Sequence, residues 1–375
     1  MKNIKVKNIA FVSMVLAALA LFTGCQDVIY ANIRKEVKLR DASIKGDINS
    51  IIRYQNDFYC ANGNIYRKSK DATSPGGWSK ISSPSGYVIS LAADNDYLYA
   101  LLGISKEDLS EGENVPVRRE LWCYKDGDGW KKVTGVFGSG DIAYKSGGEI
   151  KTNLFGTNAI ASANRSAYFI VNGGSAGYKV YKLNGAAVAT TWGSGTGETA
   201  LSTTNADTKP TSSTQSCVYD GSAVRFFNSR GSCTNETNSA APTIYYYGDS
   251  STLRWGKKGT APVSSDSVGA KSGVLSIGYT SNYLLVGTSA GISHHALSAA
   301  GVPSSSSTEF STNAEATLSS QYNILAILVA QPEKSETETI IYASQNYTGS
   351  GSNSAQFNHI CMWSYYPSTH EWNRE

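Results

Sequence analysis

The chain has 375 residues, of which 33 are basic and 30 are acidic, for a formal net charge of +3. A nucleic-acid-binding protein should carry a basic stripe, and no block of like charge occurs here. We therefore expect no nucleic-acid partner. Only 17% of the residues are charged, below the roughly 25% of typical soluble domains, so Ser, Thr, Asn and Gly must supply much of the polar surface.

The first 24 residues have the three-part layout of a secretory signal. Lys2, Lys5 and Lys7 form a positive start, and an uncharged stretch of apolar or small residues follows from position 9 to position 22. A helix needs about 20 residues to span a bilayer, so cleavage is a better interpretation than permanent insertion. Without residues 1–24 the chain has 30 basic and 30 acidic residues.

The sequence Leu21-Phe22-Thr23-Gly24-Cys25 resembles the lipobox of bacterial lipoproteins. The resemblance implies that residues 1–24 are a signal peptide and that Cys25 carries acyl chains such as palmitate. Phe22 stands where Leu is usual, a departure that spirochaete-type lipoproteins tolerate. Two or three acyl chains supply the several anchors that stable membrane attachment needs. We therefore expect a protein of the cell envelope that is anchored to a membrane by lipid.

Gln26 and Asp27 follow the expected lipidation site and give a weak indication of an outer-membrane location. The sequence leaves open whether the protein faces the periplasm or the outside.

Five cysteines remain beside Cys25, and none has metal-ligand spacing. Cys60, Cys123 and Cys361 lie in apolar, strand-like runs and are expected to be small buried side chains. Cys217 and Cys233 flank one hairpin-like segment and are the only pair for which we consider a disulfide.

Short β-rich runs separated by turn residues predict strands, and helical periodicity is nearly absent after the signal. The clearest runs lie at 57–61, 97–102, 167–171, 223–227, 283–287, 324–330 and 339–343. The run at 324–330 is apolar at every position, as expected of a strand that is buried on both faces. Stacked propeller blades bury both faces of their inner strands, whereas a half-solvated sandwich would alternate.

Successive runs of strands each close on a tryptophan: Trp78, Trp130, Trp192, Trp255 and Trp372. The first spacings are 52, 62 and 63 residues, and Phe310 falls near the middle of the last gap of 117. Four strands in each unit of about 40 to 60 residues are typical of a propeller blade. We predict an all-β fold, a β-propeller of six four-stranded blades. Seven blades remain the alternative, because the fifth unit is poorly marked.

The predicted organisation is a signal peptide at 1–24, a lipidated N-terminus and tether at 25–45, and the propeller at 46–375. The expected blades are 46–83, 84–135, 150–194, 214–258, 272–312 and 316–375. Segments 103–119, 196–213 and 331–337 are expected to be inserted loops, and 36–39 is a candidate outer strand for the last blade. Most of the 23 Tyr and 7 Trp side chains are expected to pack between blades.

Two turns resemble degenerate Asp-box (BNR-like) repeats of sialidase-type six-bladed propellers: Ser69-Lys70-Asp71 with Gly76-Gly77-Trp78, and Lys125-Asp126-Gly127-Asp128-Gly129-Trp130. The resemblance covers two blades and implies the fold, because Asp boxes lie away from the active face. Sialidase-like hydrolysis would need three arginines around a carboxylate, a Tyr nucleophile with a Glu, and an acidic Asp. The Phe-Arg-Ile-Pro type motif of that family is missing, and arginines such as Arg53, Arg67 and Arg254 sit at strand ends.

No residue pattern predicts a cofactor, a metal site or a catalytic residue. His294 and His295 are adjacent, so on a strand they point to opposite faces and cannot chelate one ion. Asp126 and Asp128 imitate the start of a calcium loop, but Phe137 occupies the twelfth position, where such a loop has Glu.

The function we expect is that of a non-catalytic binding or scaffold module for a protein or a carbohydrate partner, presented by the insertions 103–119 and 196–213. Two alternatives stay open, a glycoside-processing (sialidase-like) enzyme and an outer-membrane assembly scaffold. The enzyme needs a carboxylate cluster near the propeller axis. Three or more charged side chains converging in an axial funnel would favour the enzyme, and a lining of Ser, Thr, Gly and aromatic residues would favour the binding module.

Overall fold

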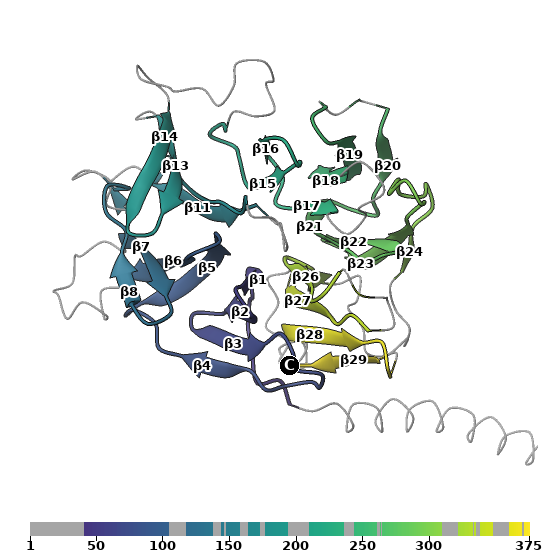
Figure 1. Cartoon of the computed structure of the whole chain (residues 1–375), viewed down its shortest axis with the longest axis horizontal. Coiled ribbons are helices and arrows are strands. Elements are labelled where there is room, and N and C mark those ends of the chain that lie inside the picture. The colour runs from purple at the N-terminus through teal and green to yellow at the C-terminus, as the bar shows by residue number, and fades with distance from the viewer. Residues whose placement is uncertain are drawn as a thin grey trace, which may run out of the picture.

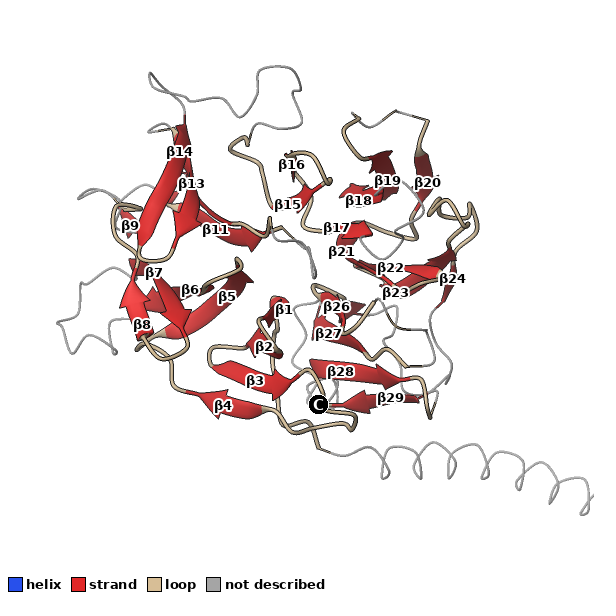
Figure 2. Ribbon diagram, in the orientation of Figure 1, coloured by secondary structure: helices blue, strands red, loops and turns tan. Residues whose placement is uncertain are grey.

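The computed structural model describes residues 41–104, 118–137, 144–145, 148–157, 164–172, 177–193, 210–235, 244–260, 263, 265–309, 322–332, 334, 338–347, 360–369 and 371–375. Within these residues the regular structure is all β (Figure 2). No helix in this part of the chain could cross a membrane. Cys25, residues 25–40 of the expected tether and the candidate strand at 36–39 lie outside the described residues, whereas residues 41–45 of that tether are described.

Six antiparallel sheets of four or five strands stand in a ring and form a six-bladed β-propeller (Figure 1). Each blade follows the chain in order from an inner strand at the axis to an outer strand at the rim. The first blade contains β1 (Ser50–Tyr54), β2 (Asp57–Ala61), β3 (Ile65–Ser69) and β4 (Ser79–Ile81). The second contains β5 (Tyr87–Ala93), β6 (Leu98–Ile104), β7 (Arg118–Lys125) and β8 (Gly129–Lys132).

The other four blades repeat this order. The third contains β11 (Lys151–Gly156), β12 (Ala167–Asn172), β13 (Tyr178–Asn184) and β14 (Ala187–Gly193). The fourth contains β17 (Ser232–Asn235), β18 (Ile244–Asp249), β19 (Thr252–Lys257) and β20 (Ser267–Gly269). The fifth contains β21 (Val274–Tyr279), β22 (Tyr283–Thr288), β23 (Gly291–Ala296) and β24 (Thr308–Glu309). The sixth contains β25 (Tyr322–Asn323), β26 (Ile327–Val329), β27 (Ile341–Tyr347), β28 (Cys361–Tyr366) and β29 (Glu371–Arg374).

A two-stranded sheet, β15 (Ser216–Tyr219) and β16 (Val224–Phe227), stands in the ring between the third and fourth blades (Figure 1). Thr157, just after β11, pairs in parallel with Cys217 of β15. On the other side Thr234 Oγ1 of β17 donates to the carbonyl of Tyr219 at 2.8 Å. The axis is therefore surrounded by the inner strands of six blades and by β15. A separate short pair, β9 (Tyr144–Lys145) and β10 (Gly148–Glu149), precedes the third blade.

Burial on both faces explains why several strands have no polar alternation. Every residue of β6 is buried, because one face packs on the first blade and the other on the third. Tyr245 and Tyr246 point to opposite faces of β18, and both are fully buried. The prediction that aromatic side chains pack between blades is thus confirmed for these residues, and two neighbouring tyrosines can both be buried because both faces of the blade are covered.

The first and last blades close the ring through the two ends of the described chain. The backbone amides of Ser43 and Ile44 donate to the carbonyl of Glu375 at 2.8 and 3.1 Å. Lys45 forms an isolated bridge with Cys361 of β28. Side chains of β2 and β27 share one hydrophobic cluster, in which the rings of Phe58 and Tyr342 lie 5.6 Å apart.

The predicted six-bladed propeller is confirmed, and the irregular part of the ring differs from the one expected. The fifth blade, which the sequence marks poorly, is complete in four strands. The fourth predicted blade, 214–258, instead joins the two-stranded sheet to the first three strands of the real fourth blade. The predicted strand 324–330 is also shorter, because only residues 327–329 form β26.

Candidate functional site

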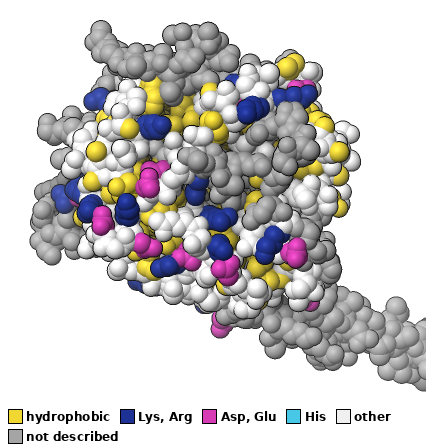
Figure 3. All heavy atoms as spheres, viewed as in Figure 1, with side chains coloured by type: hydrophobic (Ala, Val, Ile, Leu, Met, Phe, Trp, Pro, Cys, Tyr) yellow, Lys and Arg dark blue, Asp and Glu magenta, His cyan; other side chains and the backbone are white. Residues whose placement is uncertain are grey.

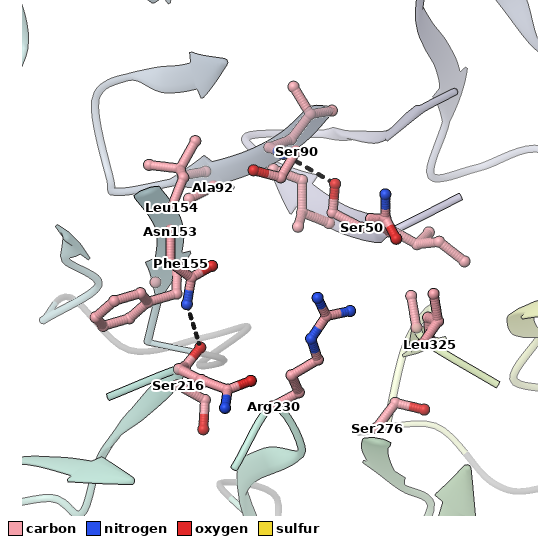
Figure 4. Close-up of a pocket in the computed structure, with 18 of the residues that line it drawn as sticks. Ser50, Ser90, Ala92, Asn153, Leu154, Phe155, Ser216, Arg230, Ser276 and Leu325 are labelled. Carbon is pink, nitrogen blue, oxygen red and sulfur yellow. Dashed lines mark hydrogen bonds between the residues drawn. The ribbon is translucent and has the colours of Figure 1, made fainter. Parts of the chain in front are cut away.

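A cavity of about 260 Å³ lies on the propeller axis. Residues of all seven strands that surround the axis contribute to its wall, namely β1, β5, β11, β15, β17, β21 and β26. Figure 4 shows side chains from these strands pointing into it from several directions, with Ser50 and Ser90 opposite Ser216 and Arg230. The cavity is therefore built on the strands at the centre of the fold.

The inner strands run in the same direction, so the cavity has two distinct ends. Asn49 Nδ2 donates to the Ile89 carbonyl at 3.5 Å, and Ser50 Oγ accepts from the Leu91 amide at 2.9 Å, so positions advance together along β1 and β5. We call the end where inner strands begin the entry end, and the opposite end the far end.

A second cavity of about 490 Å³ adjoins the first at the entry end. The two cavities share six lining residues: Ile89, Leu101, Thr152, Asn153, Gln215 and Arg230. We call the two together the axial funnel. Its wall includes the residues Ser212 and Ser213 and the residue Arg119, which belong to the margins of the two insertions that we expected to present a binding surface. The insertions' residues 105–117 and 194–209 lie outside the described residues.

Five basic side chains line the axial funnel, and none of its described lining residues is Asp or Glu. Arg230, from the turn before β17, lines both cavities and is exposed. Arg119 and Lys151 lie at the entry end, and Arg53 and Arg165 lie at the far end. A cleft lined by one sign of charge focuses the potential and raises the local concentration of ions of the opposite sign. The funnel is therefore electrostatically suited to an anion.

Arg230 is the basic side chain most directly placed for such an ion. Its guanidinium extends into the middle of the cavity, with Ser50 and Leu325 among the residues around it (Figure 4). It takes part in no ion pair with the part of the chain that the structure describes. A guanidinium offers five N–H donors in a planar fork that matches carboxylate and phosphate oxygens. Arg230 can therefore give a ligand two parallel hydrogen bonds.

At the far end, the side chain of Arg165 is bonded to the backbone of Arg53. A terminal guanidinium nitrogen of Arg165 donates to the carbonyl of Arg53. Arg53 Nε in turn donates to the Gln55 carbonyl at 3.3 Å. Both arginines line the cavity at this end and add to its positive potential.

Several polar side chains of the funnel join neighbouring inner strands. Asn153 Nδ2 donates to the Gln215 carbonyl at 3.3 Å, and Ser276 Oγ donates to the Ile324 carbonyl at 2.7 Å. Ser216 Oγ donates to the Ser229 carbonyl at 2.5 Å. These bonds fix the wall in place, so a ligand meets a preorganised site.

The count of charged residues and their chemistry lead to different conclusions about catalysis. Arg53, Arg165 and Arg230 meet the number of charged side chains that would favour an enzyme. However, the described lining contains no carboxylate, histidine or cysteine. Glycoside hydrolysis ordinarily uses a pair of carboxyl groups that flank the scissile bond. The described lining therefore offers cations to an anion and lacks the pair of carboxyl groups that glycoside hydrolysis ordinarily uses.

Figure 3 shows the molecule from the same side as Figure 1. Basic side chains lie close to the centre of the face in view, and basic and acidic groups are mixed on the surface around them. Among the described residues there is no group of three or more His, Cys, Asp or Glu side chains that could hold a metal ion.

The tryptophans of the repeat lie at the rim of the propeller, far along each blade from the axis. Trp130, Trp192 and Trp372 lie in the outer strands β8, β14 and β29, and Trp78 directly precedes β4. Trp255 differs, because it lies in the third strand, β19, and a further strand follows it. The repeat therefore marks blade ends and brings no tryptophan to the funnel.

All five described cysteines are buried, and no disulfide joins any two of them. Cys217 lies in β15 and Cys233 in β17, and the structure does not join them. The sequence suggested one hairpin, whereas β15 and β17 belong to two different sheets. Burial raises the pKa of the Cys217 thiol and of the Cys233 thiol well above the usual range. Neither thiol is therefore activated as a nucleophile.

The basic residues of the funnel were missed in the sequence analysis. Arg53 was noted only as a residue at the end of a strand, and Arg119, Lys151, Arg165 and Arg230 carried no motif. A positional signal exists for Arg53, Lys151 and Arg230, because they lie in or directly before inner strands of their blades. Using it requires knowledge of which strand of each blade is innermost.

Comparison with known protein families gives one match. Residues 2–108 match the model of the TP013X lipoprotein family. The matched part begins in the expected signal peptide, includes Cys25, and ends beyond the first two strands of the second blade. This similarity supports a lipoprotein with a lipid-anchored membrane location. A comparison with curated proteins found no match.

Proposed function

We propose that this chain is a lipid-anchored, non-catalytic binding module of the cell envelope, and that its axial funnel takes an anionic ligand. The observation that carries the proposal is the one-sided charge of the funnel, with five basic side chains and no acidic one among its described lining residues. The chain without residues 1–24 has equal numbers of basic and acidic residues. The charge at the axis is therefore a local feature and does not follow from composition.

The size of the funnel limits the ligand to a small group or to the end of a larger molecule. The axial cavity of about 260 Å³ and the entry cavity of about 490 Å³ together fall within the range of small-molecule sites. Carboxylate and phosphate groups are the anions that arginine recognises by paired hydrogen bonds. A sugar acid, a phosphorylated small molecule or an acidic side chain of a protein partner each carries such a group.

The absence of a carboxylate in the described lining supports binding without turnover. A sialidase-like enzyme would share the arginines but would also need acidic groups beside them, and none is present among the described residues of the funnel. The membrane part of the proposal rests on the lipobox-like sequence at Cys25 and on the lipoprotein family match.

Titration calorimetry on the full-length protein in nanodiscs of a zwitterionic lipid tests the proposal. The probes are inorganic phosphate, citrate and glucuronate, with neutral glucose as the control. We expect at least one anion to bind, and its affinity to fall as the salt concentration rises, because salt screens charge. Equal affinity for glucose and for every anion would contradict anion binding. Release of product from a fluorogenic sialoside or another fluorogenic glycoside would contradict the non-catalytic assignment.

A further inference from the structure

A separate cavity of about 320 Å³ lies between the first two blades, away from the axis. It is lined by the connection from β4 to β5 and by one side of the second blade. Its lining residues are Ser83, Pro84, Ser85, Ile104, Arg118, Glu120, Trp122 and Trp130. It shares no lining residue with the axial funnel. We call this cavity the indole groove.

The strand geometry places two indole rings on the same wall. Arg118, Glu120 and Trp122 occupy alternate positions of β7 and so point to one face. On β8, Trp130 pairs with Tyr124, two residues beyond Trp122 on the same face of β7. The groove therefore has a wall of two neighbouring indoles that ends at a charged pair.

Both indole N–H groups are already used inside the protein. Trp122 Nε1 donates to Glu120 Oε2 at 3.0 Å, and Trp130 Nε1 donates to the Ser82 carbonyl at 2.9 Å. The ring of Trp130 also packs on Tyr124, with a centroid separation of 5.2 Å. Both tryptophans are nevertheless partly exposed. They are fixed in orientation and offer a ligand their apolar ring surface.

Arg118 and Glu120 form the charged pair at the end of this wall, and Arg118 keeps N–H groups that a ligand can reach. Glu120 is buried and accepts from Lys132 Nζ at 2.6 Å and from Trp122, so its oxygens are largely occupied. Arg118 Nε lies 3.5 Å from the same carboxylate, and the Arg118 side chain is 40% exposed. The remaining N–H groups of Arg118 can therefore reach a ligand, and Ser83 and Ser85 add hydroxyl groups to the lining.

We propose that the indole groove binds pyranose sugars of a glycan. A pyranose ring of glucose type carries its hydroxyl groups at the rim and presents apolar C–H groups on its faces. The fixed indoles match the face of such a ring, and Arg118 and the serine hydroxyls match its rim. A volume of about 320 Å³ is at the lower end of small-molecule sites and suits one or two sugar rings. This site is independent of the proposed anion in the funnel.

The test is binding of N,N′-diacetylchitobiose and cellobiose to the full-length protein in lipid nanodiscs, free of sugar-based detergents. Saturation-transfer NMR reports which sugar protons touch the protein, and tryptophan emission reports contact with the indoles. We expect transfer to the ring C–H protons and a change in emission. Binding of neither disaccharide would overturn the proposal, and so would capture of a proline-rich peptide by the groove in place of either sugar.

Conservative variants keep the outcome interpretable, because Trp122 and Trp130 also pack on the first blade. Trp130→Phe keeps an aromatic ring but shrinks the stacking surface, and we expect it to weaken sugar binding about fivefold. Arg118→Gln should weaken it about threefold. The matched control is Arg254→Gln. Arg254 lies on the third strand of the fourth blade, far from the groove, and pairs there with Asp249. Sugar binding that is equal in all three variants and the parent protein would overturn the proposal.

Discussion

Lys68 and Glu375 form a fully buried ion pair between the first and last blades, with Lys68 Nζ 3.0 Å from Glu375 Oε2. Neither side chain is exposed, and the two residues are 307 positions apart in the sequence. Glu375 Oε2 also accepts from the amide of Gly76 at 2.7 Å and from Trp78 Nε1 at 2.9 Å. Lys68 Nζ also donates to the Tyr366 hydroxyl at 3.1 Å. The charges that close the ring therefore have several hydrogen bonds each.

Removing one partner of this pair should destabilise the propeller strongly. Lys68→Met leaves the Glu375 carboxylate buried without its cation, and such a change typically costs about 3–5 kcal/mol. Urea unfolding of the full chain, followed by tryptophan emission, measures the loss. The matched control is Lys70→Met, because the exposed pair of Lys70 and Asp71 should contribute less than about 1 kcal/mol. Equal stability of the two variants would show that Lys68 does not close the ring.

Glu120 should make the stability of the protein depend on acid pH. Although burial opposes its charged form, hydrogen bonds from Lys132 and Trp122 hold the pKa of Glu120 below its ordinary value. A lowered pKa stabilises the folded state above the unfolded pKa, and this contribution is lost as the pH falls through the folded pKa. Glu120→Gln should therefore lower stability at pH 7 by about 1–2 kcal/mol, with a smaller difference below pH 4. Parallel unfolding curves at pH 7 and pH 3.5 measure the difference, and a gap that does not shrink at the lower pH would contradict this account.

The five described cysteines should react only after unfolding. Burial raises the pKa of the Cys60 thiol well above its ordinary value and that of the Cys361 thiol to about 12. We expect iodoacetamide to leave the native protein unmodified at these positions and to modify all five in denaturant without reductant. Peptide mass spectrometry gives the count. A cross-linked Cys217–Cys233 peptide would restore the disulfide considered from the sequence.

Lipid attachment should depend on Cys25. Metabolic labelling with a fatty-acid analogue should label the parent protein, and Cys25→Ala should abolish the label and leave the protein in the soluble fraction of the envelope. The mature parent protein should also lack residues 1–24 by mass spectrometry. Equal labelling of the variant and the parent would disprove lipidation at this residue.

The fold could be predicted further than the site, for physical reasons. Strands such as 57–61 and 167–171 were predicted nearly to the residue, because β-rich runs between turn residues are local signals. The repeat of Trp78, Trp130 and Trp192 also gave the blade ends, since each is a local rim feature. The extra sheet formed by β15 and β16 was not predicted, because its strand signals resemble those of a blade and the sequence does not show that only two strands pair in it.

The basic funnel could not be predicted because its residues come together only when the ring closes. Arg53 and Arg230 are far apart in the sequence, and each occupies an unremarkable place at the end of a strand or in a turn. They meet because β1 and β17 are the innermost strands of two different blades, so residues near the ends of both strands line the axis. No local pattern shows which strand of a blade is innermost.

The central claim is that the axial arginines bind an anion, and Arg230→Gln tests it most directly. The change keeps a polar side chain of similar length and removes the charge that extends into the cavity. For the anion that binds the parent protein most tightly, we predict a Kd at least tenfold higher in Arg230→Gln and unchanged in the rim control Arg254→Gln. An equal Kd in the Arg230→Gln variant and the parent protein would contradict the account.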